Sequence, residues 1–385
     1  MNSCSWQLFR YSLPLKQTLR MLGHELQERS GLILRLQDES GNVGEGEIAP
    51  LPGMHPETLQ LAEKQICNYL YSKKSNPGNS PDVIASFQNL SASVCFGLEM
   101  AQLTLKQSSR TKRFNNSKDT TRRDTKTAER NYLSSKSGNT SLKIPINGLT
   151  TGSGNELKQE CQELKKNGFE AVKLKVGRLT VPEEVERVKL VRQILGDEFE
   201  LRLDANRAWE WKEALQFANA VRECKIEYCE EPLRDFHRLK ELHEQTGMPL
   251  ALDETLWNVP APETEFSAAR ISLSGIKTLI LKPGILGGME KTKSWVEYAK
   301  INAVDCVLSS CFESGLALNW IALMTGELFS APAACGLDTS KWFLQDLIDP
   351  PFCIKQGSYL FPKHWPAANT DLLTLTAQST WDYGT

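Results

Sequence analysis

The sequence predicts an α/β barrel preceded by a smaller α+β unit. Eight strand-like segments begin at intervals of 24 to 29 residues between residues 144 and 338, and amphipathic stretches separate most of them. Charged side chains stand at the C-terminal ends of five consecutive strands. Alternating strands and helices form either a closed barrel or an open doubly wound sheet. No glycine-rich nucleotide fingerprint follows the first strand, which favours the barrel.

The first 106 residues predict the α+β unit. Strand-like WQLFRYSL is followed by a loop rich in polar residues, and GLILRL and VGEGEIAP then flank the turn DESGN as in a β-hairpin. Two stretches with apolar residues at helical spacing come next, at 57–71 and 82–105. Strands followed by helices are typical of a small α+β domain.

Residues 107–141 differ in composition from both flanks. They hold nine Lys or Arg against three Asp or Glu, and hardly any large apolar side chains. Such a segment cannot bury enough surface to order itself, so it is predicted to be a disordered basic insertion. A nucleic-acid-binding tail is the alternative for this segment. The net charge of −2 gives no reason to expect nucleic acid as a partner of the whole chain.

The barrel is predicted over residues 142–339. Its strands, in order, are IPINGL from 144, AVKLKV from 171, ELRLDA from 200, IEYCEE from 226, LALDE from 250, TLILKP from 278, DCVLSS from 305 and ACGLD from 334. Amphipathic stretches such as PEEVERVKLVRQIL and WKEALQFANAVREC supply the helices. The C-terminal segment, from about 340 to 385, is expected to pack back on the N-terminal domain.

The lengths of the apolar segments and the spacing of the cysteines indicate in which cellular compartment the protein is expected. No stretch approaches 18 uninterrupted apolar residues, and the first residues lack the apolar core of a signal peptide. A cytoplasmic protein without membrane insertion is therefore expected. The ten cysteines are scattered and form no CxxC pair, which indicates core side chains in a reducing compartment rather than disulfides or zinc ligands.

Charged residues at the strand ends indicate a catalytic centre. Side chains two residues apart on a strand share one face, so Lys173 and Lys175 point the same way. In barrel enzymes the C-terminal ends of the strands are where catalytic side chains assemble. The set, in strand order, is Lys173 and Lys175, Asp204, Glu230 and Glu231, Asp253 and Glu254, and Lys282.

This set suits one kind of chemistry. Carboxylates on adjacent strands repel one another unless a cation lies between them. Oxygen ligands with room for substrate oxygens suit Mg²⁺, with Mn²⁺ as a substitute. A cationic neighbour, a nearby metal and burial each lower the pKa of a lysine, so Lys173 beside Lys175 predicts a general base. A strong base opposite a divalent metal suits removal of a proton α to a carboxylate, so a small carboxylate is the expected substrate.

The same segments resemble a known family. KLKVG, RLDAN, CEEPL, LDE and LKPG are similar, in order and spacing, to the barrel motifs of the muconate-lactonizing subgroup of the enolase superfamily. The N-terminal region resembles the capping domain of that family. The resemblance implies a modified TIM barrel, (β/α)7β, with an α+β capping domain. It also implies the following roles: Lys175 as base, Lys173 tuning it, Lys282 on the opposite face, and Asp204, Glu230 and Asp253 as metal ligands.

Two further segments resemble the o-succinylbenzoate synthases of this subgroup, GEGEIAPLPGMHPETL and SSCFESGLAL. Such an enzyme dehydrates 2-succinyl-6-hydroxy-2,4-cyclohexadiene-1-carboxylate to o-succinylbenzoate through an enediolate, by syn elimination, in menaquinone or phylloquinone synthesis. Dipeptide epimerases carry an Asp-x-Asp near the last strand, which the segment CGLD lacks. Two alternatives stay open: an N-acylamino acid racemase or cycloisomerase that uses both lysines, and a barrel without catalysis.

Four more residues are predicted to contact the substrate. Arg202 shares a strand face with Asp204 and is expected to point into the barrel, where it could instead pair with a carboxylate as structural support. Asn206 follows two residues after Asp204 and could orient a lysine or a metal ligand. Ser309 and Ser310 end the seventh strand and are candidates to hold a substrate carboxylate.

The capping domain is expected to cover the barrel mouth with two loops, around residues 13–30 and 49–56. They contain His24, Met54 and His55. Because such loops form the walls of a site whose chemistry comes from the strand ends, they are expected to govern substrate choice more than proton removal.

Overall fold

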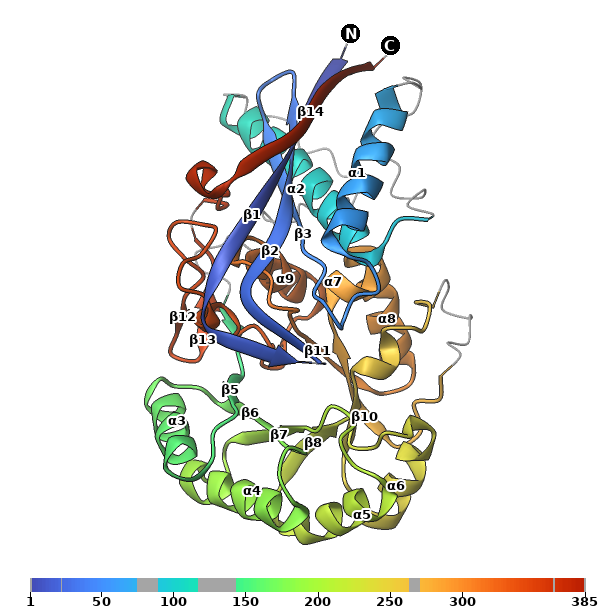
Figure 1. Ribbon diagram of the computed structural model, residues 1–385, viewed down its shortest axis with the longest axis vertical. Helices are drawn as coiled ribbons and strands as arrows, with labels where there is room; N and C mark the ends of the chain where they lie inside the picture. Colours follow the sequence, from blue (N-terminus) through green and yellow to red (C-terminus); the bar gives the residue numbers. More distant parts are fainter. Residues whose placement is uncertain are drawn as a thin grey trace, which may run out of the picture.

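A computed structural model of the chain describes residues 2–21, 23–74, 89–116, 143–262, 271–362 and 364–383. Within these residues the N-terminal domain lies at one end of the molecule together with both chain ends, and the barrel lies at the other (Figure 1). No described helix is long and apolar enough to cross a membrane.

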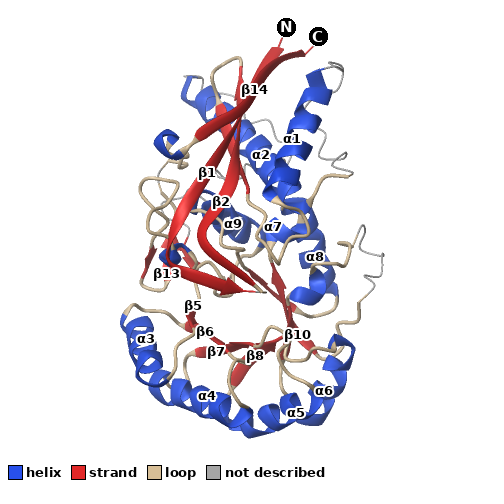
Figure 2. Ribbon diagram, viewed as in Figure 1, coloured by secondary structure: helices blue, strands red, loops and turns tan. Residues whose placement is uncertain are grey.

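The capping domain is a four-stranded antiparallel sheet with two helices packed against it (Figure 2). The strand order is β14-β1-β2-β3. The bounds are β1 Asn2–Met21, β2 His24–Asp38, β3 Val43–Ile48, β14 Thr374–Tyr383, α1 Leu59–Lys74 and α2 Ala92–Asn116. The predicted hairpin of GLILRL and VGEGEIAP is β2–β3, with pairs from Leu32↔Ile48 to Gln37↔Val43.

The polar loop expected after WQLFRYSL is not a loop. Strands β1 and β2 continue as an antiparallel ribbon as far as the pair Met21↔His24, with a register shift between Pro14 and Leu19. The polar composition suggests a loop, but the backbone hydrogen bonds between paired strands form whether the side chains are polar or apolar. The ribbon is therefore long enough to extend well beyond the sheet.

Glycines in the GEGE segment let helix α2 lie directly on strand β3. A Cβ atom on Gly46 would stand 1.8 Å from the carbonyl oxygen of Gly97, and one on Gly44 would stand 2.2 Å from that of Ala101. Only residues without a side chain permit this approach.

The barrel is a seven-stranded sheet of neighbouring parallel strands in the order β11-β10-β9-β8-β7-β6-β5. Its strands are β5 Gly148–Thr150, β6 Ala171–Lys175, β7 Glu200–Asp204, β8 Ile226–Glu230, β9 Leu250–Leu252, β10 Ile276–Leu281 and β11 Asp305–Leu308. Its helices are α3 Gly154–Lys166, α4 Val181–Leu195, α5 Trp211–Ala220, α6 Leu239–Thr246, α7 Pro283–Leu286, α8 Met289–Ile301 and α9 Gly315–Leu328.

The predicted eighth strand, ACGLD, closes the ring through isolated bridges rather than as a regular strand. Cys335 bridges to Ile146 beside the first strand, and Gly336 bridges to Ser309 beyond β11. The predicted first strand, IPINGL, is divided between β5 and β4 (Lys143–Pro145). Strand β4 forms a small sheet with β13 (Ser358–Leu360) and β12 (Ile354–Lys355).

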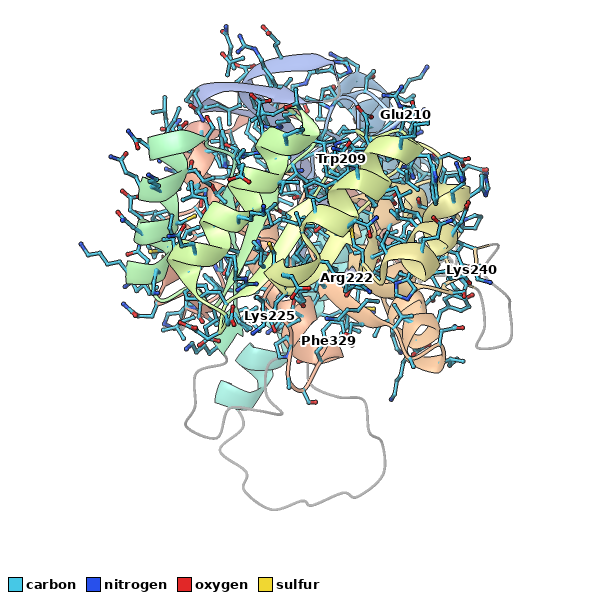
Figure 3. The ribbon with its side chains drawn as sticks, turned by 90° about the horizontal axis from the view of Figure 1, so that it is seen from below. Trp209, Glu210, Arg222, Lys225, Lys240 and Phe329 are labelled. Carbon is cyan, nitrogen blue, oxygen red and sulfur yellow. The ribbon has the colours of Figure 1, made fainter. Side chains whose placement is uncertain are left out.

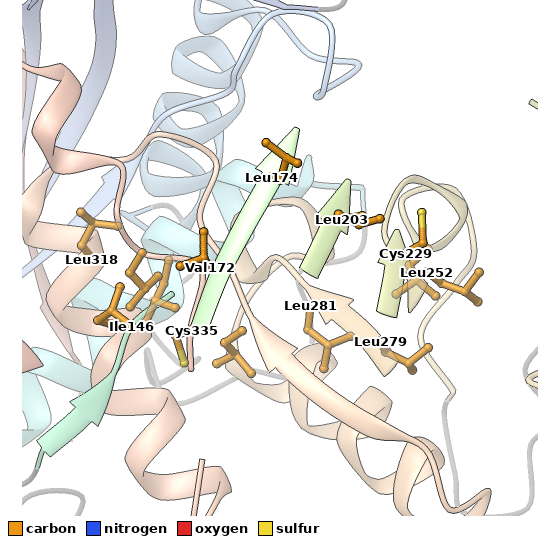
Figure 4. Packing of buried hydrophobic residues seen from close by; sticks show 14 of the residues in the cluster. Ile146, Val172, Leu174, Leu203, Cys229, Leu252, Leu279, Leu281, Leu318 and Cys335 are labelled. Atoms are coloured by element: carbon orange, nitrogen blue, oxygen red, sulfur yellow. The ribbon is translucent and has the colours of Figure 1, made fainter. Parts of the chain in front are cut away.

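Strand residues alternate between the outside and the inside of the barrel. The outward side chains are apolar and buried, among them Val172, Leu174, Leu203, Cys229, Leu252 and Leu281 (Figure 4). Inside, a lower layer contains the cluster of Tyr228, Ala251, Ile280 and Val307. Two residues further along the same strands stand Glu230, Asp253, Lys282 and Ser309. The alternation of side chains that builds the core therefore also places the polar and charged residues at the barrel mouth, facing inward.

The two domains share one apolar core. Phe9, Tyr11 and Phe96 of the capping domain belong to the same buried cluster as the barrel side chains. The C-terminal segment returns to the capping domain, where β14 pairs with β1 from Asn2↔Tyr383 to Arg10↔Thr374. The two domains are thereby joined by packing as well as by the chain.

Helix α2 extends to Asn116, so residues 107–116, which the sequence assigns to the basic insertion, continue this helix. The prediction of disorder for 117–141 falls outside the described residues.

Candidate active site

A cavity of about 650 Å³ opens at the C-terminal ends of the barrel strands. Strand β1 contributes Gln17, Thr18, Leu19 and Arg20 to its wall, and the loop after β3 contributes Met54. Seven of the predicted site residues line it: Lys173, Lys175, Asp204, Asn206, Lys282, Ser309 and Ser310. The cavity therefore brings together charged groups from the ends of the three strands β6, β7 and β10 under a wall supplied by the capping domain.

Lys173 and Asp204 line the bottom of the cavity, and the carboxyl groups of Glu230 and Asp253 are buried nearby without being among its lining residues. Asp204, Glu230 and Asp253 are each 1% exposed. The Nζ atom of Lys173 lies 3.2 Å from Asp204 Oδ2 and 3.2 Å from Glu230 Oε2. Burial lowers the pKa of Lys173, but Glu230, Asp204 and Asp253 more than offset this and raise the pKa above its ordinary value. Lys173 is therefore a fixed cation held by the surrounding carboxyl groups.

Lys175 reaches from β6 into the cavity and is held by two acceptors. Its Nζ donates to Asp204 Oδ2 at 2.6 Å and to Asn206 Oδ1 at 2.8 Å. Asn206 in turn donates to Glu254 Oε1 at 2.7 Å. Burial raises the pKa of Asp204, but Lys175 and Lys173 overcome it and hold the pKa well below its ordinary value. Asp204 is therefore ionised, and the predicted orienting contact of Asn206 is to this lysine.

Lys282 follows β10 and faces Asp253, with 2.5 Å between Nζ and Oδ2. Burial lowers the pKa of Lys282, but Asp253 outweighs it and the pKa lies above its ordinary value. Trp257 completes this corner, because its Nε1 donates to Asp253 Oδ1 at 3.0 Å and its ring lies 5.2 Å from Lys282 Nζ. Sequence reasoning missed Trp257, whose only local signal is its position four residues after Asp253.

The two adjacent glutamates of CEEPL have different surroundings. Glu230 ends β8 and faces the interior beside Lys173. Glu231 has a φ of 38°, which turns it toward the neighbouring strand. Its Oε1 accepts from the backbone nitrogens of Asp253 at 3.0 Å and Thr255 at 2.8 Å, and its Oε2 pairs with Arg207 at 3.1 Å. Glu231 is thus fully engaged in holding the loop after β9.

The donor set fits a hard divalent cation. Among the residues with described side chains, no three of the types His, Cys, Asp and Glu already lie close enough together to hold a metal ion. Lysine ammonium groups stand between them instead. All three carboxylates nevertheless act on the single ammonium of Lys173, so they converge on one region. Burial raises the pKa of Glu230 to about 8, and Asp204 and Asp253 add to the rise, so additional positive charge would be stabilised there.

Arg202 lies below the cavity and is not among its lining residues. It is completely buried, its Nε donates to Glu227 Oε2 at 2.6 Å, and its guanidinium lies over the ring of Tyr228 at 5.2 Å. It also donates to Asn147 Oδ1 at 3.2 Å. These contacts make Arg202 part of the barrel floor, one layer beneath Asp204.

Ser309 and Ser310 line the cavity but use their hydroxyl groups locally. Both hydroxyls lie 3.2 Å from the carbonyl oxygen of Gly336 and donate to it. The hydroxyl of Ser310 also lies 2.9 Å from that of Thr339. In this arrangement the two serines tie β11 to the closing segment of the barrel.

Helix α4 holds the end of β6 through a buried ion pair that sequence reasoning missed. Arg187 donates to the carbonyl oxygen of Lys175 at 3.0 Å, and Glu184 accepts from the backbone nitrogens of Arg178 at 2.8 Å and Leu179 at 3.0 Å. The two side chains also pair with each other. On an amphipathic helix such charges look like a solvated face, so only the fold identifies them as support for the site.

The two capping histidines do not face the cavity. His24 is exposed and begins β2, and His55 is buried. The Nδ1 atom of His55 accepts from the nitrogen of Leu51 at 3.0 Å, and its Nε2 lies 3.3 Å from the carbonyl oxygen of Gly284. His55 therefore connects the capping loop to the barrel, and Met54 is the member of this loop that reaches the cavity wall.

Comparison with known proteins places the sequence in a family. Residues 156–365 match the family described as Enolase C-terminal domain-like, and residues 3–105 match MenC, N-terminal domain. The o-succinylbenzoate synthase of Vibrio cholerae is 30% identical over 97% of the chain and 96% of its own length. Protein PHYLLO, chloroplastic, of Arabidopsis thaliana is 29% identical over 83% of the chain, which spans only 20% of that protein.

Solved structures show the same fold. The dipeptide epimerase of Cytophaga hutchinsonii, complexed with Mg and a dipeptide, has a TM-score of 0.74 at 20% identity, covering 99% of the chain and all (100%) of its own. The muconate lactonizing enzyme of Pseudomonas fluorescens has a TM-score of 0.73 at 16% identity, covering 95% of the chain and 96% of its own. The predicted barrel with an α+β capping domain is confirmed.

Proposed function

The chain belongs to the o-succinylbenzoate synthase family of the enolase superfamily, and from that premise we propose that it dehydrates 2-succinyl-6-hydroxy-2,4-cyclohexadiene-1-carboxylate to o-succinylbenzoate, in menaquinone or phylloquinone synthesis. One observation carries the proposal. Lys175 and Lys282 line one cavity from strands β6 and β10, and the three buried carboxylates end the strands between them. This is the arrangement needed to remove a proton α to a carboxylate and to stabilise the resulting anion.

Asp204, Glu230 and Asp253 would hold Mg²⁺, or Mn²⁺ in its place. When bound, the ion supplies a Lewis acid that stabilises the negative charge developing on the substrate carboxylate. Glu231 is a poor candidate for a ligand, because both of its oxygens are already engaged.

Lys175 is the best placed of the three lysines to act as the base. Its side chain is 19% exposed, against 11% for Lys173 and 7% for Lys282. It would take the α-proton and then, as an acid on the same side, assist the departure of hydroxide. Lys173 and Lys282 have pKa values raised by their carboxylate neighbours despite burial, so both suit the role of fixed cations facing the anion.

An N-acylamino acid racemase is the second candidate. The observation that favours it is that Lys175 and Lys282 enter the same cavity from separate strands, as two bases on opposite faces of a substrate would. The side chain of Lys282 is less exposed than that of Lys175, 7% against 19%, and Asp253 raises its pKa although burial lowers it, which speaks against its use as a base.

The test is a pair of assays on the purified protein. Dehydration of the cyclohexadiene substrate in the presence of Mg²⁺, abolished by EDTA, is the expected result. Racemisation of N-acylamino acids under the same conditions is expected to be slower. Faster racemisation than dehydration would favour the second candidate, and absence of both activities would indicate a barrel without catalysis.

A further inference from the structure

We propose that Arg178 binds the substrate carboxylate that is remote from the reacting carbon, and that this contact makes the cavity selective for dicarboxylates. The inference rests on the proposed function, whose substrate carries a second carboxylate at the end of its succinyl chain. Arg178 lines the same cavity as Lys175, on the loop that directly follows β6. A guanidinium group binds a carboxylate through two parallel hydrogen bonds.

The charges of the cavity wall single out Arg178. The lining cations are Arg20, Lys173, Lys175, Arg178 and Lys282, and the lining anions are Asp204 and Asp338. Each of the three lysines has a carboxylate within 3.2 Å. Arg20 lies 2.6 Å from Glu25. Within the described part of the chain, the guanidinium of Arg178 is the one cation of this wall with no ion pair, so it is available to an anionic ligand.

The backbone that carries Arg178 is fixed. Glu184, which is completely buried, accepts from the nitrogens of Arg178 and Leu179, and Arg187 holds the carbonyl oxygen of Lys175. Lys175 and Arg178 are therefore presented from one rigid turn, with the base at the strand end and the guanidinium, which is exposed, farther along the loop. Binding of a ligand that contacts both side chains would therefore require little additional ordering of this part of the backbone.

Other polar groups of the wall are less suited to a second carboxylate. The hydroxyls of Ser309 and Ser310 donate to Gly336, so each would have to give up a hydrogen bond before donating to a ligand. Asp338 is an anion paired with Lys341. Arg178 needs no such exchange.

The experiment compares two ligands by calorimetry in the presence of Mg²⁺. One is o-succinylbenzoate, and the other is 2-butanoylbenzoate, which has the same skeleton with a methyl group in place of the terminal carboxyl. The parent protein is expected to bind the dicarboxylate about 10- to 100-fold more tightly, as for a charge-assisted pair of hydrogen bonds. Arg178→Met is expected to lose most of this preference while binding the monocarboxylate as before, and Arg178→Lys to recover part of it.

Two comparison variants sharpen the result. Arg222→Met removes an exposed arginine from the face of the barrel turned away from the capping domain (Figure 3) and should leave both affinities unchanged. Arg20→Met removes the rival cation of the wall. Loss of the preference in Arg20→Met but not in Arg178→Met would overturn the proposal. So would an equal loss for both ligands in Arg178→Met, or a parent protein that binds both ligands alike.

Turnover separates this inference from the proposed function. With the cyclohexadiene substrate, Arg178→Met should raise KM more than it lowers kcat, because the reacting atoms are not touched. If the parent protein catalyses dehydration but Arg178→Met keeps the full preference for the dicarboxylate ligand, the role of Arg178 is refuted and the proposed function stands. If Arg178→Met loses the preference for the dicarboxylate ligand but the parent protein does not catalyse dehydration, the proposed reaction is refuted and the role of Arg178 stands. A parent protein that binds neither ligand would refute both.

Discussion

Lys173 and Lys175 stand two residues apart on β6 and differ through their surroundings. Lys173 is buried and lies between Asp204 and Glu230, whereas Lys175 projects into the cavity and is held by Asp204 and Asn206. A lysine enclosed by carboxylates is a structural cation, and one at the cavity wall can exchange a proton with a ligand. The pair is therefore better described as one fixed charge and one reactive group than as two equivalent charges.

Replacing the two cavity lysines separately should distinguish base from fixed cation. Lys175→Ala is expected to lose about 10²- to 10⁴-fold in kcat, as when a general base is removed, and to show no exchange of the substrate α-proton in D₂O. Lys282→Ala should also be impaired, because a cation facing the anion is lost, but should retain slow exchange. Exchange is measured by NMR of recovered substrate. Loss of exchange for one enantiomer only in each variant, with an N-acylamino acid, would instead indicate a racemase.

The adjacent residues Glu230, which ends β8, and Glu231, which follows it, should respond in opposite ways to neutralisation. Glu230→Gln is expected to abolish metal-dependent turnover and to weaken Mn²⁺ binding, measured by electron paramagnetic resonance, without loss of stability, because burial already raises the pKa of this carboxyl to about 8. Glu231→Gln should instead lower stability by about 1–3 kcal/mol, because Glu231 accepts from Thr255 and pairs with Arg207. Weaker Mn²⁺ binding in Glu231→Gln than in Glu230→Gln would reverse the assignment.

At the scale of elements, carboxylates of the capping domain cap helices of the barrel. Glu99 of α2 accepts from the backbone nitrogens of Met289 and Glu290 at the start of α8. Glu47 of β3 accepts from the nitrogen of Ser314 at 2.9 Å, at the start of α9. The first backbone nitrogens of a helix have no partner within it, and these carboxyl oxygens accept from them. Because α8 and α9 follow the strands that carry Lys282 and Ser309, the capping domain helps to position the wall of the site.

Glu99 should make this contact sensitive to pH. Burial raises the pKa of Glu99 to about 7, although the two backbone donors oppose the rise. The folded protein therefore binds this proton more tightly than the unfolded chain does. The stability that Glu99 contributes is fully present below the unfolded pKa, near 4.5, and is lost as pH rises through about 7. Between pH 5 and 8 the parent protein should lose about 2 kcal/mol more than Glu99→Gln, measured by urea unfolding.

Glu297, on helix α8, whose start Glu99 caps, provides the control for Glu99. Glu297→Gln removes a charge that is half exposed and pairs only loosely with Lys293, at 3.9 Å. It should keep the pH dependence of the parent protein. Equal pH dependence in Glu99→Gln and the parent would show that Glu99 does not control the contact between α2 and α8.

At the scale of the whole molecule, strands from both ends of the chain complete the capping sheet. Strand β14 pairs with the edge of β1, and helix α1 contacts β14 (Figure 1). Strand β1 then continues to Leu19 and Arg20, which line the cavity. The C-terminal strand therefore supports, through β1, one wall of the site.

Removing residues 374–385 should loosen that wall without touching the catalytic strands. The variant is expected to lose at least about 2 kcal/mol of stability, because the backbone hydrogen bonds of one edge of β1 are lost. KM should rise more than kcat falls. Circular dichroism melts and steady-state kinetics check both expectations, and removal of residues 384–385 alone is the control. A fall in kcat at constant KM would place this strand in the support of the catalytic groups instead.

The sequence by itself determined the alternation of strands and helices and the charged residues at the barrel mouth. Both are local properties. A strand end is marked by the few residues around it, and the period of two decides which side chains share a face, as for Lys173 with Lys175. The family motifs further implied Glu230 rather than Glu231, although the local pattern of CEEPL alone does not separate them.

Only the tertiary structure decided which side chains meet. It placed Arg202 in the floor beneath the cavity, brought Arg187 against the carbonyl of Lys175, and turned Glu231 toward the loop after β9. It also made a long paired ribbon of the segment expected to be a polar loop. These outcomes depend on contacts between residues far apart in the chain, and on the burial that those contacts create. Neither can be read from a local pattern, because the same charged residue is a solvated side chain on one fold and a buried partner on another.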